Sequence, residues 1–444
     1  MFNNKKIFIL GMARSGYEVA KILASRNNNI ILNDGNSDQN KAHVKELEDL
    51  GVKVILGSHP DDIFTKDFDY LIKNPGITNE HKYVKFAKEN NIPVINEIEV
   101  VYNLLPKNVS IVGITGTNGK TTTATLIYEV LKKGDRNVHL VGNIGFPVAS
   151  IYNDIKEGDI LVIEISNFQL MNFDKFKTDV SILTNISPAH IDFHGSYENY
   201  KQTKKKIFNH HTKKDLAFIN YGDEESMELT KDINSTKIYF SSKKKKNLYL
   251  EDNNICYNDD KIININDIKV KGLHNYENIM CAIGVGMHFN VPLSSIKEVL
   301  TSFTGVEHRI EYVKDINGIS IYNDSKATNN KACTIALSAF DSPTVLIMGG
   351  LDRGQTFDEL TDYVTHVKFI AAFGETKNKI KAFADEHKLP CKTYDNLEKA
   401  TLDAYTKCNK GDVLLLSPAC ASWDQYKCFE DRGTEFKKII NNIK

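Results

Sequence analysis

The segment 115–122, Thr-Gly-Thr-Asn-Gly-Lys-Thr-Thr, contains residue types suited to binding phosphate. It follows the apolar run 109–114, which predicts a buried strand, and precedes a predicted helix over 120–132. Glycines permit a tight turn in which backbone N–H groups point at phosphate oxygens. In such a loop Lys120 reaches the terminal phosphates, and the Thr121 hydroxyl binds Mg²⁺. We therefore predict a phosphate site here, although the strict motif has glycine where this chain has Ile114, so the loop is a variant.

Glu164 ends another predicted strand, 160–163. In a parallel sheet that strand end lies beside the phosphate loop, where a carboxylate can hold Mg²⁺ directly or through water. The alternative interpretation is a partly exposed acid that pairs with a lysine. Past the strand that ends at Leu183 comes His190-Ile-Asp-Phe-His194, and we expect His190 to be functional and His194 less so. No cysteine accompanies them, so we do not predict a zinc site.

The turn Gly11-Met-Ala-Arg-Ser-Gly16 lies between a predicted strand and a predicted helix, a common place for phosphate binding. Asp34 follows at the end of the next strand, as in dinucleotide sites. However, Ala13 takes the place of the middle glycine, and its methyl group hinders close approach of a pyrophosphate. Three interpretations stay open: a redox dinucleotide site, a site for another nucleotide-like group, and a purely structural turn.

Composition narrows the class of protein. The chain has 444 residues, 41% of them hydrophobic and 25% charged, which is typical of folded globular proteins. Its 56 Lys+Arg and 57 Asp+Glu nearly cancel, which argues against a nucleic-acid binder. No apolar run is long enough to insert in a membrane, and the N-terminal apolar stretch is too short for a signal peptide. We expect a cytoplasmic protein, a monomer, with seven reduced cysteines.

Three segments show strands alternating with helices, which predicts an α/β fold with parallel sheets. We expect an N-terminal Rossmann-like domain over 1–105, and a central P-loop ATPase-type domain over 106–305. A C-terminal Rossmann-like domain is expected over 306–444. From 237 to 271 the pattern becomes alternating and polar, which indicates a small antiparallel appendage on the central sheet.

Several segments together resemble the Mur ligase family, the ATP-dependent amide-forming enzymes of bacterial peptidoglycan synthesis. The phosphate loop is similar to the family's ATP loop. Its later blocks are matched, in the expected order, by Val141-Gly-Asn-Ile-Gly145, Glu164-Ile-Ser166, His190-Ile-Asp192, Leu273-His-Asn-Tyr-Glu-Asn278 and His308-Arg309. The C-terminal blocks are most similar to the family's D-glutamate-adding branch; they are Asn323-Asp-Ser-Lys-Ala-Thr-Asn329, Gly349-Gly-Leu-Asp-Arg353 and Ser417-Pro-Ala-Cys-Ala-Ser-Trp-Asp-Gln-Tyr426.

The resemblance implies that ATP, Mg²⁺, UDP-N-acetylmuramoyl-L-alanine and D-glutamate are bound, and that an acyl phosphate forms during ligation. The implied catalytic residues are Lys120, Glu164, His190, Lys204 and Lys326. The implied ATP-side residues are Gly116, Thr117, Asn118, Gly119, Lys120, Thr121, Thr122, Asn275, Arg309 and Asp324. The implied metal ligands are Thr121, Glu164, His190 and a carbamylated Lys204, although composition alone would place Lys204 on a solvated helix face.

The resemblance also implies three groups of substrate contacts. The uridine diphosphate end would be held by Arg14, Ser15, Asp34 and Gly76. The muramoyl-alanine end would be held by Asn143 and His190. The D-glutamate pocket would contain Lys326, Thr328, Arg353, Ser422 and Phe429. In this chain Arg353 replaces a lysine of some members, Trp423 a commonly aliphatic residue, and Asn74 a common serine, so details of pocket shape differ.

Three other functions are compatible with parts of the sequence. One is a ligase of the same family that adds L-alanine, a diamino acid or folate glutamates, against which the 417–426 block argues. Another is a nicotinamide oxidoreductase that uses the Gly11–Gly16 turn, which fails on Ala13 and leaves the phosphate loop unexplained. The third is a nucleotide-binding switch that does not consume ATP, against which the His190 and Lys326 blocks argue.

Overall fold

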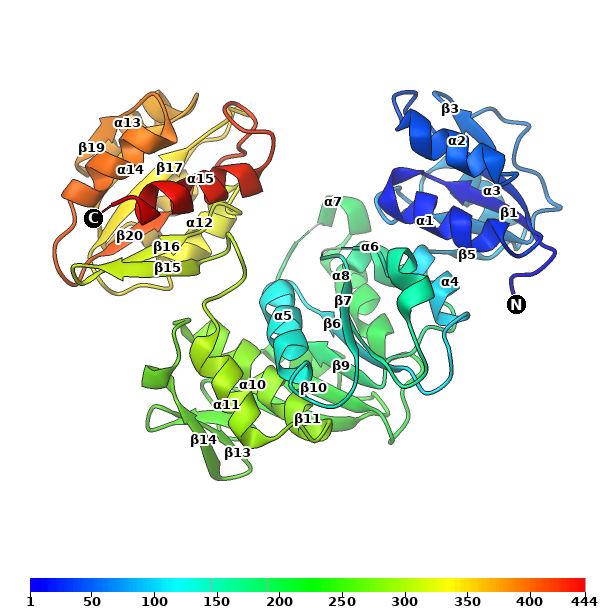
Figure 1. The fold of residues 1–444 in the computed structure, drawn as a ribbon, viewed down its shortest axis with the longest axis horizontal. Helices are drawn as coiled ribbons and strands as arrows, with labels where there is room; N and C mark the ends of the chain where they lie inside the picture. The colour runs from blue at the N-terminus through cyan, green and yellow to red at the C-terminus, as the bar shows by residue number, and fades with distance from the viewer. Residues whose placement is uncertain (145, 190, 444) are drawn as a thin grey trace. The chain divides into compact units, whose positions relative to one another are not determined.

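The computed structural model describes residues 1–144, 146–189 and 191–443. Three β-sheets form along the chain (Figure 1). Contacts divide the chain into two compact units, one of residues 1–263 with 277–299 and one of residues 264–276 with 300–444. Within the described residues, none of the helices is both long and apolar enough to cross a membrane.

The first sheet is parallel, with strand order β3-β2-β1-β4-β5. Its central strand β1 is apolar, and Ile7 to Leu10 are completely buried, as expected where helices cover both faces. The strands are β1 (Lys6–Leu10), β2 (Asn29–Asp34), β3 (Lys53–Leu56), β4 (Tyr70–Lys73) and β5 (Val94–Ile95). The helices are α1 (Ala13–Ala24), α2 (Lys41–Asp49), α3 (Lys82–Glu89) and α4 (Glu97–Tyr102).

The central sheet has nine strands in the order β14-β13-β12-β11-β10-β9-β6-β8-β7. Strand pairing is parallel from β7 to β12, and β12 and β13 pair antiparallel. The predicted antiparallel appendage is therefore an extension of this sheet. The strands are β6 (Ser110–Thr115), β7 (Val138–Gly142), β8 (Ile160–Glu164), β9 (Val180–Leu183), β10 (Leu216–Asn220), β11 (Thr236–Ser241), β12 (Leu248–Glu251), β13 (Asn254–Tyr257) and β14 (Asp260–Asn264).

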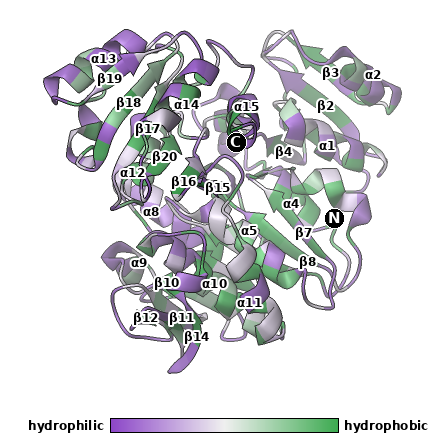
Figure 2. Ribbon diagram, turned by 60° about the vertical axis from the view of Figure 1, so that its left-hand side comes forward, coloured by the Kyte–Doolittle hydropathy of each residue, from purple (hydrophilic) through white to green (hydrophobic). Residues whose placement is uncertain are grey.

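Helices accompany the central strands in the order expected of an α/β sheet. The α-helices are α5 (Lys120–Leu131), α6 (Asn167–Leu170), α7 (Ile191–His194), α8 (Tyr197–Lys205), α9 (Glu224–Leu229), α10 (Leu273–His288) and α11 (Leu293–Ser302). Short 3₁₀ helices are η1 (Val148–Asp154), η2 (Lys206–Phe208) and η3 (Ile265–Asp267). Figure 2 shows strand β8 as mostly hydrophobic, and its five residues are all buried.

The helix α4 joins the first sheet to the central part of the same unit. The Glu99 carboxylate accepts hydrogen bonds from the backbone N–H groups of Asp174, Lys175 and Phe176 at 2.9–3.0 Å. Glu97 accepts from the N–H of Ala149 at 2.6 Å, and burial raises the pKa of Glu97 to about 7. These buried bonds satisfy backbone donors that would otherwise be costly to bury.

The third sheet has six strands in the order β15-β16-β20-β17-β18-β19. Strands β15 and β16 pair antiparallel, and the pairing from β16 to β19 is parallel. The strands are β15 (Glu311–Ile316), β16 (Ile319–Asn323), β17 (Thr344–Gly349), β18 (Val367–Phe373), β19 (Cys391–Thr393) and β20 (Val413–Leu416). The helices are α12 (Asn330–Leu337), η4 (Asp358–Tyr363), α13 (Lys377–Glu386), α14 (Leu397–Thr406) and α15 (Phe429–Asn441).

The predicted α/β class with three sheets is confirmed, and the strands predicted over 109–114 and 160–163 agree with β6 and β8 within one residue. The helix α1 begins at Ala13, three residues before the predicted start at Gly16, so the phosphate-type turn is shorter than expected. The three domain boundaries, 1–105, 106–305 and 306–444, stay predictions, because the two compact units group the first two sheets together.

Candidate functional site

The phosphate-type loop connects β6 to α5 and has the backbone shape that its glycines require. Gly119 precedes α5 with φ of +81°, and Gly116 has φ of +148°. A Cβ atom on Gly116 would lie 1.9 Å from the Thr184 hydroxyl oxygen, so no larger residue fits. The helix α5 therefore begins directly after a glycine turn, and the N–H groups at the start of such a helix can bind phosphate.

Lys120 is the first residue of α5, and its side chain turns back over the loop. Its Nζ donates to the carbonyl oxygens of Gly116 and Thr117, both at 2.9 Å. The lysine is thus held across the place where a phosphate chain would lie. A phosphate oxygen is a stronger acceptor for an ammonium group than a neutral carbonyl oxygen, so bound phosphate would draw the lysine towards itself.

Glu164 lies at the end of β8 and contacts two predicted site residues. Its Oε2 accepts from the Thr121 hydroxyl and its Oε1 from the Asn143 amide, both at 2.8 Å. Glu164 is only 2% exposed and Thr121 is 6% exposed. Strands β8 and β6 pair in parallel, with Glu164 opposite Ile114, which brings the carboxylate to the loop. The structure therefore brings Thr121, Asn143 and Glu164 together, and the Thr121 hydroxyl and the Glu164 carboxylate are oxygen donors of the kind that Mg²⁺ prefers.

Lys204 lies in the last turn of α8 and is 2% exposed. Its Nζ donates to the Gly116 carbonyl oxygen at 2.8 Å and to the Asn167 side-chain oxygen at 2.7 Å, and it lies 4.7 Å from the centre of the Tyr200 ring. Burial, and secondarily the Lys120 cation, lowers the pKa of Lys204 well below its ordinary value. The interpretation of a solvated helix face is therefore wrong.

The remaining predicted metal ligand is His190. His190 lies outside the described residues. Among the described residues, no group of three or more His, Cys, Asp or Glu side chains is placed to hold a metal ion. A metal at this loop would instead use the mixed set of Thr121, Glu164 and a modified Lys204, of which only Glu164 belongs to those four types.

A second hollow lies at the carboxyl end of the first sheet. Its volume is about 250 Å³, and Gly11, Asp34 and Asn74 are among its lining residues. Asp34 accepts from the backbone N–H of Met12 at 2.7 Å, at the start of α1. The Asn74 side chain donates to the Ser15 hydroxyl at 3.1 Å and accepts from the N–H of Gly76 at 3.0 Å. Ser15, Asp34 and Gly76 therefore all reach this end of the sheet.

Ala13 determines what the turn after β1 can bind. It has φ of +28°, in the left-handed region, where a residue with a Cβ atom is strained. Arg14 is exposed in the first turn of α1. A Cβ on Gly16 would lie 2.0 Å from the Gly11 carbonyl oxygen, so that glycine serves helix–strand packing. The turn thus has the packing glycine of a dinucleotide fingerprint without the glycine that admits a pyrophosphate.

In the C-terminal unit, three neighbouring strands end at one edge of the sheet. Asn323 of β16 and Ile347 of β17 both lie level with Leu416 of β20. The loops after these strands therefore start side by side, and each contains predicted site residues. The loop after β16 contains Asp324, Lys326 and Thr328, the loop after β17 contains Arg353, and the loop after β20 contains Ser422.

Asp324 links the first of these loops to the third. It accepts from the Ser417 hydroxyl at 2.7 Å and from the N–H of Ile310 at 3.2 Å. It is 3% exposed, and burial raises its pKa to about 7, against smaller opposing effects of the hydrogen bonds from Ser417 and Ile310 and of the cations Arg309 and Arg432. Asp324 and Arg309 are thus close enough to interact electrostatically, and their role on the ATP side stays a prediction.

Asn275 lies near the start of α10, in the segment 264–276 that belongs to the second unit. Its amide donates to the Lys271 carbonyl oxygen at 2.8 Å. Burial and the Arg309 cation lower the pKa of the neighbouring His274. The predicted ATP-side residues therefore divide between the two units, with the phosphate loop in the first and the other three residues in the second.

Two cation–ring contacts occur among the predicted D-glutamate residues. Lys326 Nζ lies 5.7 Å from the centre of the Phe429 ring, at the start of α15. The Arg353 guanidinium lies 4.6 Å from the ring of Trp423, which is 65% exposed. Such contacts are worth about 0.5–1 kcal/mol at exposed sites.

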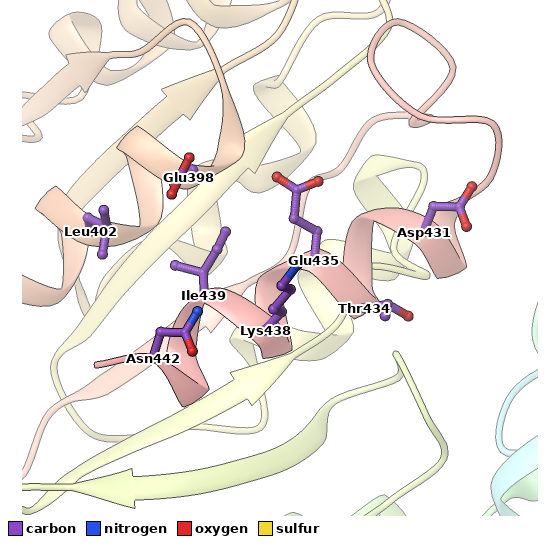
Figure 3. Close-up of a pocket in the computed structure, with 8 residues that line it drawn as sticks. All are labelled: Glu398, Leu402, Asp431, Thr434, Glu435, Lys438, Ile439 and Asn442. Carbon is purple, nitrogen blue, oxygen red and sulfur yellow. The ribbon is translucent and has the colours of Figure 1, made fainter. Parts of the chain in front are cut away.

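A separate groove of about 610 Å³ lies between α14 and α15 (Figure 3). Its lining residues are Glu398, Leu402, Asp431, Thr434, Glu435, Lys438, Ile439 and Asn442. None of the predicted site residues is among them. The candidate site is therefore formed by strand ends and loops, and this groove plays no part in it.

Sequence reasoning missed two buried groups that support the site. Asn167 receives the Lys204 ammonium group and donates its own amide to the Tyr200 carbonyl oxygen at 3.0 Å. Arg432 is completely buried beneath the C-terminal strand edge. The sequence could have indicated Asn167, because it lies one residue beyond the matched block that ends at Ser166. Nothing in the sequence indicated Arg432, because an arginine in a polar helix is usually exposed.

Three family models match the chain. They are the Mur ligase MurD-like N-terminal domain over residues 5–96, the Mur ligase middle domain over residues 114–286, and the Mur ligase glutamate ligase domain over residues 308–420. The three matched ranges follow the three sheets in order and include the phosphate loop, Glu164 and Lys204, whereas Ser422, Trp423 and Phe429 lie beyond the end of the third range.

Similar proteins are known at the level of both sequence and structure. The UDP-N-acetylmuramoylalanine–D-glutamate ligase of Geobacillus kaustophilus (strain HTA426) is 41% identical over 447 residues, covering 100% of this chain and 99% of that protein. The protein of the same name from Lactococcus lactis subsp. lactis (strain IL1403) is 41% identical over 445 residues, covering 100% and 98%.

Solved structures show the same fold at low sequence identity. The UDP-N-acetylmuramate-alanine ligase MurC of Thermotoga maritima matches with a TM-score of 0.59 and 18% identity, covering 99% of this chain and 100% of that one. The MurF ligase of Thermotoga maritima in complex with ADP matches with a TM-score of 0.56 and 19% identity, covering 93% and 95%.

Proposed function

The chain belongs to the Mur ligase family, and from its full-length similarity to UDP-N-acetylmuramoylalanine–D-glutamate ligases we infer that it joins D-glutamate to UDP-N-acetylmuramoyl-L-alanine in peptidoglycan precursor synthesis. ATP supplies the energy and is released as ADP and phosphate. The observation that most strongly supports this function is the phosphate loop with Thr121 and Glu164 joined beside it.

A carboxylate does not react with an amine at neutral pH, so it must first be activated by ATP, which the phosphate loop would bind. Transfer of the γ-phosphoryl group to the substrate carboxylate gives an acyl phosphate, from which phosphate leaves readily. Both partners in the transfer are anionic, so their repulsion and the charge on the transferred group must be neutralised. Lys120 and the N–H groups at the start of α5 supply this neutralisation.

Mg²⁺ fits the buried hydroxyl of Thr121 and the carboxylate of Glu164, which are hard oxygen donors 2.8 Å apart. When bound there, Mg²⁺ would screen the phosphate charges. Glu164 holds the ligand geometry through its second oxygen, which accepts from Asn143. The His190 position is assigned to the same metal by the family resemblance alone.

An unmodified Lys204 could not serve as a metal ligand, because its ammonium group would repel a metal cation. Its lowered pKa favours the neutral amine, whose lone pair can attack the carbon of CO₂. A C–N bond forms, one proton leaves to solvent, and the product is an anionic carbamate. A carbamate at Lys204 would supply a further oxygen ligand to the metal, and Asn167 would remain beside it as a hydrogen-bonding partner.

The D-glutamate pocket would lie over the three strand ends of the C-terminal unit. The two carboxylates of D-glutamate need cationic partners, which Lys326 and Arg353 supply, and Phe429 and Trp423 hold those cations against their rings. Ser422 and Thr328 lie in the same loops and offer hydroxyl groups. The neutral D-glutamate amine then attacks the acyl carbon and forms a C–N bond, the nitrogen loses a proton to solvent, and the tetrahedral intermediate collapses to the amide as the C–O bond to phosphate breaks.

Replacing Arg353 with alanine is expected to raise the KM for D-glutamate by about tenfold to a hundredfold, because a charge-assisted hydrogen bond is worth about 1.5–3 kcal/mol. The KM for ATP should change less than twofold, about the scatter of such measurements. Steady-state phosphate release with each substrate varied in turn measures both. The control is Lys379→Ala, which removes an exposed lysine paired with the neighbouring Asp352. An unchanged KM for D-glutamate in Arg353→Ala would remove Arg353 from the pocket.

The proposed function is tested by phosphate release from ATP and Mg²⁺ in the presence of UDP-N-acetylmuramoyl-L-alanine and a panel of amino acids. We expect release with D-glutamate and none above background with L-glutamate, L-alanine or a diamino acid. Release with a different amino acid would keep the ligase chemistry and change the substrate. ATP binding without release under any of these conditions would favour a nucleotide-binding switch.

A further inference from the structure

Arg432, in the second turn of α15, has no exposed surface and is the largest completely buried side chain in the described residues. Within the described residues, all the hydrogen bonds that its guanidinium group donates go to uncharged oxygen atoms. Burial lowers its pKa to about 10, which still leaves it charged at neutral pH. Burying a cation without a hydrogen-bonded carboxylate is costly, and well-packed apolar side chains of similar volume would stabilise a core at least as well.

The partners of Arg432 belong to three different loops. Nε donates to the Ser325 hydroxyl at 3.0 Å and Nη2 to the Ser325 carbonyl oxygen at 2.7 Å. Nη1 donates to the carbonyl oxygens of Cys420 at 3.1 Å and Gly349 at 3.4 Å. Ser325 follows β16, Gly349 ends β17, and Cys420 follows β20. One guanidinium group therefore joins the starts of the three loops that contain the proposed D-glutamate residues.

The neighbouring backbone is packed closely around this group. Ser325 also donates its hydroxyl to the Phe429 carbonyl oxygen at 2.8 Å, which connects the first loop to the start of α15. A Cβ atom on Gly350 would lie 3.2 Å from Arg432 Nη1 and 2.2 Å from the Ala421 carbonyl oxygen. The loops after β17 and β20 therefore touch one another over the guanidinium, and neither can move without disturbing it.

We propose that Arg432 is the positioning residue of the amino-acid pocket: it fixes the loops of Lys326, Arg353 and Ser422 relative to one another and so determines the affinity for D-glutamate. This inference rests on the proposed function. Arg432 itself touches no substrate, because it is completely buried. Its planar fork of donors can reach three loops at once, whereas a lysine ammonium, a single point charge, cannot reproduce that geometry.

Arg432→Lys and Arg432→Met test the proposal, with Lys438→Met as the control. Lys438 is an exposed cation of the same helix and lines the groove of Figure 3. We expect both Arg432 variants to raise the KM for D-glutamate by about tenfold to a hundredfold, the effect of misplacing binding groups by about an ångström. The KM for ATP and the KM for the uridine nucleotide substrate should stay within about twofold. Ser325→Ala should shift the KM for D-glutamate in the same direction by less.

Trp423 gives a readout that does not depend on turnover. It is the chain's single tryptophan and lies in the loop after β20. We expect D-glutamate to change its fluorescence in the wild-type protein, and we expect this change to need a higher D-glutamate concentration in Arg432→Lys. A KM increase shared equally by all three substrates, or unchanged D-glutamate titration in folded Arg432→Lys, would overturn the proposal. Failure of the wild-type protein to ligate D-glutamate would instead overturn the proposed function.

Discussion

Lys120→Ala is expected to lower the rate of phosphoryl transfer on the order of a thousandfold or more. Removing one preorganised electrostatic group from such a site costs about a hundredfold to a thousandfold, and cations at transferring phosphoryl groups can cost more. Lys120 is the first residue of α5, and its Nζ donates to two loop carbonyl oxygens at 2.9 Å, so alanine removes the charge together with these two hydrogen bonds. Single-turnover release of phosphate measures the effect.

The matched control for this experiment is Lys132→Ala, at the other end of the same helix. Lys132 is about half exposed and pairs only with Glu129 on the surface, among the described ion pairs. It should retain the wild-type rate. Wild-type turnover by Lys120→Ala would contradict the assignment of the ATP site to this loop, whatever the thermal stability of the variant.

Lys204→Ala is expected to lower the rate of phosphate release by about a hundredfold to a thousandfold. Alanine removes the amine that would react with CO₂, and with it an anionic oxygen ligand of the metal. Acetate or another short carboxylate should restore part of the activity, because the vacated space lies next to Asn167 and Gly116. Removing CO₂ from the wild-type protein should lower its activity, and adding bicarbonate should restore it.

Lys205→Ala is the control for this series. Lys205 is the next residue along α8, but its side chain is partly exposed and pairs with the exposed Asp232. It should show no loss of rate and no response to acetate. An unmodified Lys204 in the presence of Mg²⁺ and CO₂, read from the carbon resonance of labelled CO₂ or from the mass of the peptide, would contradict the carbamate.

Motifs that are continuous in the sequence were predicted well. The phosphate loop is a local structure, because its glycines fix the turn and the following helix supplies the N–H groups. The meeting of Glu164 with that loop was also predictable, since parallel strands β6 and β8 bring their carboxyl ends to one edge. The strand ends of the C-terminal unit follow the same rule.

The sequence alone could not predict the burial of a side chain that is enclosed by segments distant along the chain. Lys204 lies in a helix of low hydropathy, yet Gly116 and Asn167, both far away along the chain, enclose its amine. Arg432 is similar, because its partners come from loops that lie at least 12 residues away. Ala13 adds a different case: α1 begins there, earlier than the glycine pattern indicates, although Ala13 has a positive φ.

The central claim is that this chain forms an amide through an acyl phosphate, and the fate of one oxygen atom tests it most directly. UDP-N-acetylmuramoyl-L-alanine with heavy oxygen in its carboxylate would be incubated with the protein, ATP, Mg²⁺ and D-glutamate, and both products would be weighed by mass spectrometry. We predict an amide product heavier by one glutamate residue, and one labelled oxygen in the released phosphate. Release of unlabelled phosphate without amide would show simple ATP hydrolysis and contradict the account.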